Sequence, residues 1–313
     1  MILKQVMEMF ELLDKPNANG NEIARYIKSH GNDNVEIDVK TVEGEQGNTD
    51  FVKILIKGKN GKSKNGTAKT LGIIGRLGGL GARPDMNGFV SDGDGALAAL
   101  SAGLKLVDMN EKGDVLEGDV IIATHICPDA PTLEHYPVYF MDSPVDMDTM
   151  NRLEVSQDMD AILTIDTTKG NEVLNYRGFS ISPTVKDGYI LKISDDLVNI
   201  MKKVTGKLPV VFPLSQQDIT PYGNELYHIN SILQPSTTTS SPVVGVAITT
   251  ETSVAGCATG ATQAMDVEMA GRFAVEVAKQ YGIGKCDFYD EKEFDLLLKL
   301  YGENKRFQTK GNI

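Results

Sequence analysis

Two short, almost wholly apolar runs constrain the fold of this chain more than any other feature. They are Val120–Ala123 and Ala161–Ile165, and polar residues follow each of them closely. Apolar runs of this length without alternation are typical of central strands that are covered on both faces. Because such strands occur mainly in sheets flanked by helices, the two runs predict an α/β protein.

Further segments complete an alternation of helices and strands. The sequence predicts helices over 1–15, 21–30, 96–109, 265–281 and 291–300, and strands over 35–42, 51–56, 70–74 and 243–248. This order favours a three-layer sandwich with a mixed central sheet. We expect a single α/β domain over 1–313, with 176–242 as an elaboration over the site and 57–66 as a surface hairpin tip.

Composition limits the partners of the protein. The net charge of −12 disfavours nucleic acid and anionic membranes, because both need a positive surface. No signal peptide or membrane-spanning run is visible, and three scattered cysteines are too few for a disulfide framework. We therefore expect a cytoplasmic protein that acts on a small-molecule or peptide substrate.

Two carboxylates stand where predicted strands and helices meet. Asp92 lies in the loop SDGDG before a buried helix, and Asp166 directly follows the strand ending at Ile165. A carboxylate at the carboxyl edge of an α/β sheet lies where ligands bind, and carboxylates are metal ligands. The alternatives are that Asp94 caps the helix while Asp92 shapes the turn, and that Lys169 forms a surface pair near Asp160.

The segment THICPDAP at 124–131 is a second candidate. In an extended conformation His125, Cys127 and Asp129 share one face, and all three residue types bind zinc. The alternative is a buried histidine and cysteine in a packed turn. Cys127 beside His125 also leaves cysteine chemistry open.

Two further segments follow predicted strands. GRLGGLGARP fits neither G-x-G-x-x-G nor the P-loop, but Arg76 and Arg83 are suited to clamping an anion. TTETSVAGCATG contains Glu251 and Cys257, and Cys257 has no base assigned to it by the sequence.

Several segments carry a resemblance to a known family. They are TLGIIGRLGGLGARP, THICPDAPT, LTIDTTKG, QDITPYGN and VGVAITTETSVAGCATG. Over nearly its full length the chain resembles the bacterial domain-of-unknown-function 1177 family. This resemblance implies membership of a family but no particular activity.

The order of these segments is also similar, more distantly, to two-zinc aminopeptidases. The resemblance implies that Asp92 corresponds to their metal-bridging aspartate, Asp166 to a later ligand aspartate and Asp129 to a ligand glutamate. Three features of the pattern differ. The His-x-Asp of the family becomes Arg76-Leu77-Gly78, the general base becomes Pro128, and the closing histidine has no counterpart.

The combined pattern predicts an aminopeptidase-like, metal-dependent hydrolase of small amides or peptides with a rebuilt site. Its expected cofactor is a divalent metal, zinc, held by Asp92, His125, Asp129 and Asp166, and Glu251 is the candidate base. The alternative is a non-catalytic binding protein in which Arg76 grips a carboxylate. By analogy with the peptidase group, a homo-oligomer is expected.

Overall fold

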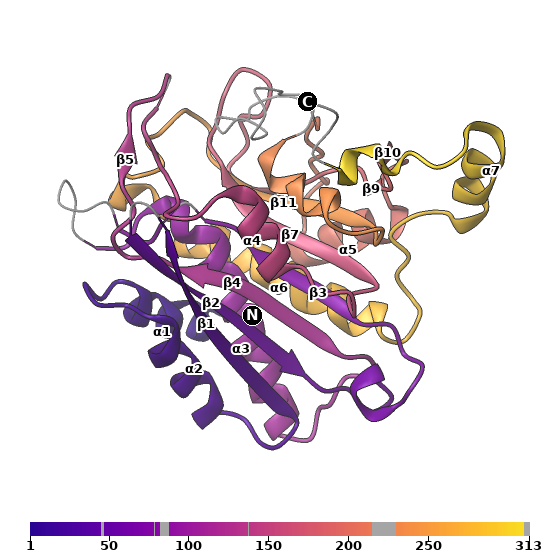
Figure 1. The fold of residues 1–313 in the computed structure, drawn as a ribbon, viewed down its shortest axis with the longest axis horizontal. Helices are drawn as coiled ribbons and strands as arrows, with labels where there is room; N and C mark the ends of the chain where they lie inside the picture. The colour runs from indigo at the N-terminus through magenta and orange to yellow at the C-terminus, as the bar shows by residue number, and fades with distance from the viewer. Residues whose placement is uncertain (45–46, 78, 82–87, 137, 215–229, 310–313) are drawn as a thin grey trace.

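A mixed sheet of nine strands forms the centre of the protein (Figure 1). The computed structural model describes residues 1–44, 47–77, 79–81, 88–136, 138–214 and 230–309. The strand order is β1-β2-β4-β3-β7-β11-β9-β10, and β8 pairs with β11. These strands are β1 (Val35–Gly44), β2 (Gly47–Ile56), β3 (Leu71–Gly75), β4 (Val120–Ile126), β7 (Ala161–Thr168), β8 (Gly178–Ile181), β9 (Val185–Lys186), β10 (Tyr189–Ile190) and β11 (Val243–Thr249).

The four central strands β4, β3, β7 and β11 run parallel. Leu71 of β3 lies opposite Val120 on one side and Ala161 on the other, so the three strands start at the same level. The outer strands β1, β2, β8, β9 and β10 pair in antiparallel fashion. Since parallel strands end at one edge, the polar residues that follow them are brought together there.

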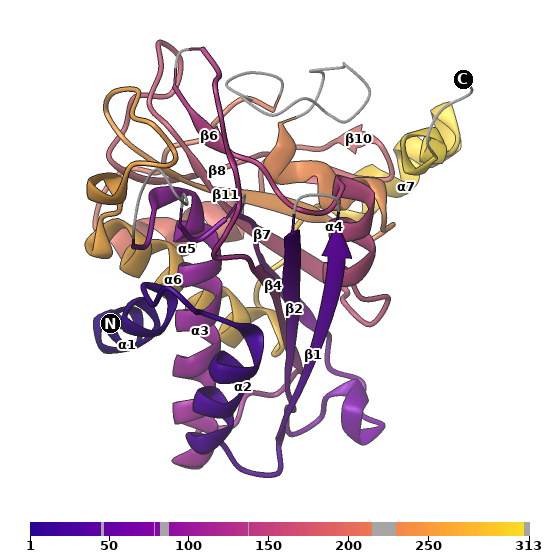
Figure 2. The ribbon, with the colours of Figure 1, turned by 60° about the vertical axis from the view of Figure 1, so that its left-hand side comes forward.

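Helices cover both faces of the sheet, as the sequence predicted. The helices are α1 (Leu3–Leu13), α2 (Gly20–Ser29), α3 (Asp94–Glu111), α4 (Met147–Glu154), α5 (Asp195–Thr205), α6 (Ala264–Tyr281) and α7 (Glu291–Tyr301). Figure 2 shows α1, α2 and α3 on one face and α4 on the other, where α4 packs on β2 and β4. No helix in the described ranges is both long and apolar enough to cross a membrane.

The core is centred on α3, whose alanine- and leucine-rich sequence is buried nearly all round. The helix packs on the sheet and contacts both α1 and α6, and α6 itself packs on β8, β11 and β3. A second, smaller apolar cluster lies on the opposite face and includes Ile74, Ala123 and Ile162. Successive side chains of a strand point alternately toward these two clusters. This alternation also decides on which face of the sheet a side chain near the end of a strand lies.

Gly95 lets α3 approach the sheet closely. A Cβ at this position would lie 2.3 Å from the carbonyl oxygen of Arg76 and 2.4 Å from that of Ile165. Both contacts are backbone atoms, so the helix would have to move. We expect Gly95→Ala to lower the free energy of unfolding by about 1–3 kcal/mol, measured by urea denaturation. Gly260→Ala is the control, because nothing lies within 4 Å of its added Cβ, and equal losses in both variants would contradict the argument.

One expectation about a connecting segment needs revision. The prediction of a hairpin tip at 57–66 is wrong, because β2 and β3 do not pair and both flank β4. The segment is instead held by Asp119, which accepts hydrogen bonds from the backbone N–H groups of Gly58 and Ser63 at 2.8 Å each. Within 176–242, the described residues add β8, β9 and β10 to the main sheet.

Candidate functional site

Three polar side chains lie side by side at the carboxyl edge of the central strands. Ile74 is opposite Ala123 and Gly75 is opposite Ile165. The residues that follow are therefore at one level: Arg76 after β3, His125 in β4 and Asp166 in β7. Arg76 and His125 are each two residues beyond Ile74 and Ala123, which both belong to the apolar cluster on the face of α4.

Arg76, Glu154 and His125 form a buried network on that face. Glu154, at the end of α4, accepts from Arg76 Nη1 at 2.7 Å and lies 2.7 Å from His125 Nδ1 through its other oxygen. Arg76 also donates to Asn151 Oδ1 at 3.0 Å and contacts the sulfur of Met147. The exposed fractions of the Arg76, Glu154 and His125 side chains are 4%, 1% and 0%. Such a network is stable only because each charge has a partner.

The electrostatics of Glu154 follow from these partners. Burial acts to raise the pKa of Glu154, but Arg76 and His125 outweigh it, so the pKa is lowered. Glu154 therefore carries its charge at neutral pH. Arg76 forms its ion pair with Glu154, because α4 places this carboxylate on the same face. Arg76 is thus held inside the protein.

A second cluster surrounds Lys169, directly after β7. Lys169 is 9% exposed, and Asp94, Asp92 and Asp166 all attract its ammonium group. Within the described part of the chain, no ion pair of 4.0 Å or less joins Lys169 to these carboxylates, so the attraction acts at longer range. The predicted surface pair with Asp160 is wrong. Asp160 precedes β7, at the opposite edge of the sheet, and bonds Lys62 at 2.7 Å.

Burial shifts the proton affinities of this cluster. It raises the pKa of Asp94 to about 8 and also raises that of Asp92, although the Lys169 ammonium opposes both shifts. The pKa of Lys169 is lowered, because burial outweighs the attraction of the three carboxylates. Asp94 therefore holds a proton at neutral pH.

Backbone contacts fix the position of Asp92. Its N–H donates to the carbonyl of Gly256 at 3.0 Å, and its Oδ2 accepts from the N–H of Met141 at 3.0 Å. The Thr167 hydroxyl donates to the carbonyl of Ser91 at 2.8 Å, which ties the turn Ser91–Gly93 to the end of β7. Asp94 is the first residue of α3 and does not cap it as expected; Gly93 occupies the cap position.

The other predicted site residues lie elsewhere. Asp129 lines a cavity of about 430 Å³ with Asn48, Cys127 and Pro144. Glu251 lines a separate open pocket of about 510 Å³ with Asn171. Arg83 lies outside the described residues. The structure thus joins Arg76 to His125 through Glu154 and leaves Asp129 and Glu251 in two separate pockets. Asp92 and Asp166 act on the Lys169 ammonium at longer range.

The predicted metal ligands do not form one donor set. In the described ranges no group of three or more His, Cys, Asp or Glu side chains is arranged to hold a metal ion. His125 is bonded to Glu154, Asp129 faces another cavity, and Asp92 and Asp166 share the field of a lysine cation. A metal ion needs several ligands converging within about 2.0–2.6 Å. The donor set as arranged does not fit a metal, so we derive no reaction step through one.

Cys127 is buried rather than reactive. Burial raises the pKa of its thiol to about 12, so the nucleophilic thiolate is scarce at neutral pH. Its neighbour His125 is 2.7 Å from Glu154. Both observations argue against the cysteine chemistry left open by the sequence.

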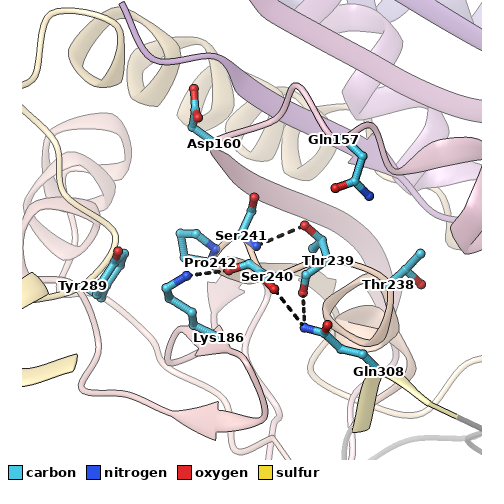
Figure 3. Close-up of a pocket in the computed structure, with 10 residues that line it drawn as sticks. All are labelled: Gln157, Asp160, Lys186, Thr238, Thr239, Ser240, Ser241, Pro242, Tyr289 and Gln308. Atoms are coloured by element: carbon cyan, nitrogen blue, oxygen red, sulfur yellow. Dashed lines mark hydrogen bonds between the residues drawn. The ribbon is translucent and has the colours of Figure 1, made fainter. Parts of the chain in front are cut away.

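A polar pocket of about 370 Å³ lies at the opposite edge of the sheet (Figure 3). Its polar groups largely bond one another. Lys186 donates to the carbonyl of Ser240, and the amide of Gln308 donates to the carbonyl of Thr239 at 2.8 Å. Because these donors are already used, the carboxyl edge carries the stronger candidate site.

Glu154 and Lys169 are the functional candidates that sequence reasoning did not assign. Glu154 ends a helix in MDTMNRLE, where no spacing distinguishes it from a surface glutamate. Lys169 follows Asp166 by three residues and lies four residues after the predicted apolar strand Ala161–Ile165, and this closeness to a strand end was the available signal. Only the tertiary packing shows that both are buried.

The sheet order and the polar carboxyl edge define an aminopeptidase-like α/β protein. A mutant of the tomato leucine aminopeptidase has a similar fold, with a TM-score of 0.50 and 14% identity. The similarity covers 87% of this chain and 61% of that one, so the chain spans about three fifths of the aminopeptidase's length. The chain belongs to the family described as "Protein of unknown function (DUF1177)", whose model matches residues 40–311. No curated protein matches it.

Proposed function

We propose that this protein hydrolyses small amide or peptide substrates at the carboxyl edge of its sheet. One observation carries the proposal: Lys169, directly after β7, is buried, and the charges of Asp92, Asp94 and Asp166 act on its ammonium group. The aminopeptidase-like fold supports it as analogy only.

The residues have complementary roles in this proposal. Asp92, whose pKa is raised, accepts a proton from water as the water oxygen attacks the carbonyl carbon. The Lys169 ammonium stabilises the oxyanion that forms. Asp94 then donates its proton to the departing nitrogen as the C–N bond breaks, which yields a carboxylic acid and an amine. The proton taken up by Asp92 restores Asp94 for the next cycle.

Turnover of aminoacyl nitroanilides and dipeptides tests the proposal. We expect Lys169→Met to lower kcat/KM by at least about 100-fold, since it removes the charge that stabilises the oxyanion. The exposed Lys203→Met is the matched control and should behave as wild type. Absence of hydrolysis by wild type across the panel, or full activity in a folded Lys169→Met, would contradict the proposal.

A metal-dependent hydrolase, as predicted from the sequence, is the competing form of this proposal. The two forms differ in their response to a chelator. Turnover that survives exhaustive chelation supports the lysine-based mechanism. Turnover lost on chelation and restored by zinc supports the metal-dependent one.

A further inference from the structure

Helix α7 lies at the margin of the molecule, apart from the other helices (Figure 1). The structure describes all 11 of its residues, and among them Phe294 alone is buried. The ring of Phe294 packs edge-on against Tyr289 and Tyr189, with centroids 5.6 and 6.4 Å away, and the Lys186 ammonium lies 4.9 Å from its centre. The chain after the helix is tied to the same place, because the Tyr189 hydroxyl donates to the carbonyl of Gly302 at 2.7 Å. The helix is thus anchored through one side, next to β9 and β10 at the end of the sheet.

The opposite side of α7 is apolar and exposed. Leu296 is two residues beyond Phe294, so its side chain points about 200° away from the anchored side. Leu300 follows one turn later on the same side as Leu296. The exposed fractions of Leu296, Leu300 and the adjacent Tyr301, which we call the outer stripe, are 53%, 61% and 73%. Because a short helix gains most of its stability by packing an apolar side, the outer stripe indicates a surface that a partner covers.

The charges along this arm identify the kind of partner. Its beginning is mainly acidic and its end is mainly basic, and all of these side chains are exposed. The acidic end consists of Asp290, Glu291, Glu293 and Asp295 with Lys292, and the basic end consists of Lys299, Lys305 and Arg306 with Glu303. Such a helix matches a copy of itself that runs in the opposite direction, because each acidic end then meets a basic end. An anionic membrane or a nucleic acid would instead be repelled by the acidic end and by the net charge of −12.

We infer that α7 forms a contact with a second copy of this chain, in which the two outer stripes pack antiparallel about a twofold axis. Leu296 of each copy then packs against Leu300 of the other. The contact is isologous, so the assembly closes at two copies. One pair of helices makes a small interface, below about 1,200 Å², so the dimer is reversible and depends on concentration. The inference does not rest on the proposed function.

Sedimentation velocity of the whole chain over a concentration series measures this association. We expect a reversible equilibrium of monomer and dimer for wild type. Leu300→Glu places a charge inside the contact and should raise the dissociation constant at least about tenfold. Leu208→Glu is the matched control, because Leu208 is 84% exposed but lies outside α7, and this variant should associate as wild type does. Circular dichroism verifies that both variants are folded.

Thiol cross-linking tests the antiparallel arrangement. The three native cysteines, Cys127, Cys257 and Cys286, are buried, so a short bifunctional thiol reagent reacts first with a cysteine introduced on the surface. Glu293→Cys lies near the start of α7 and Glu303→Cys just beyond its end. A mixture of these two variants should cross-link faster between unlike chains than either variant does with itself.

Three outcomes would overturn the inference. A wild-type chain that stays monomeric up to its solubility limit would assign the outer stripe to a different protein. A dimer that Leu300→Glu leaves intact would place the contact elsewhere on the surface. Cross-linking that is equally fast between like and unlike chains would contradict the antiparallel packing.

Discussion

Replacing Glu154 with alanine is expected to lower the free energy of unfolding by about 3–5 kcal/mol. The substitution leaves the guanidinium of Arg76 buried without its counter-charge and takes the bonding partner from His125 Nδ1. Removing one partner from a buried charge network costs far more than the network contributes in net stability. Chemical denaturation at pH 7 gives the value directly.

Two further variants make this result specific. Glu11→Ala removes an exposed helical glutamate and should change stability by less than about 0.5 kcal/mol. Glu154→Gln keeps the shape of the side chain but removes its negative charge. The pKa of Glu154 is lower in the folded protein than its ordinary value of 4.5. The charge of Glu154 therefore stabilises the folded state above about pH 4.5, and this stabilisation is lost as the pH falls through the pKa of the folded protein. The difference between wild type and Glu154→Gln should therefore shrink in acid, and a loss below about 1 kcal/mol for Glu154→Ala would refute the network's role.

Asp94→Asn is expected to stabilise the protein in alkali by up to about 6 kcal/mol, because a pKa raised by about four units corresponds to about 1.4 kcal/mol per unit. The folded pKa of Asp94 is about 8, above its ordinary 3.8, because its carboxyl group is buried. The folded state thus favours the protonated form. The stabilisation that the protonated Asp94 gives to the folded state is fully present below about pH 4 and is lost as the pH rises through about 8. Asparagine cannot ionise, so it avoids that loss.

Thermal unfolding at pH 5, 7 and 9 measures this effect. The gain of Asp94→Asn over wild type should grow with pH up to about 8 and then level off. Asp33→Asn, at an exposed position, is the matched control and should show no such growth. A gain independent of pH would mean that Asp94 does not titrate in this range.

Taken together, the carboxyl edge has two parts with different tasks. The network of Arg76, Glu154 and His125 is buried and fully engaged, which suits a rigid support. In the second part the Lys169 ammonium acts at longer range on Asp92 and Asp94, whose pKa values are raised, which suits the proposed proton transfer. Substitutions in the first part should lower stability at neutral pH, and those in the second should change the proposed chemistry and the pH dependence of stability.

Much of the fold was predictable from local patterns. The apolar runs marked the central strands, although both strands extend beyond them, so that His125 and Asp166 lie within β4 and β7 rather than after them. The spacing of apolar residues located α1, α3, α6 and α7 closely. Strand neighbours were not predictable: the polar segment 57–66 has the composition of a hairpin tip, yet β4 inserts between the strands it joins.

The sequence by itself determined the α/β class and marked Arg76, Asp92, His125 and Asp166 as polar residues at strand ends. These features depend on periodicity and on neighbours along the chain, which are local. Only the tertiary structure decided the partners: Arg76 with Glu154, and Lys169 with three aspartates. The physical reason is that charge pairing and desolvation depend on distance in space, and α4, the turn before α3 and the end of β7 meet only when the sheet is assembled.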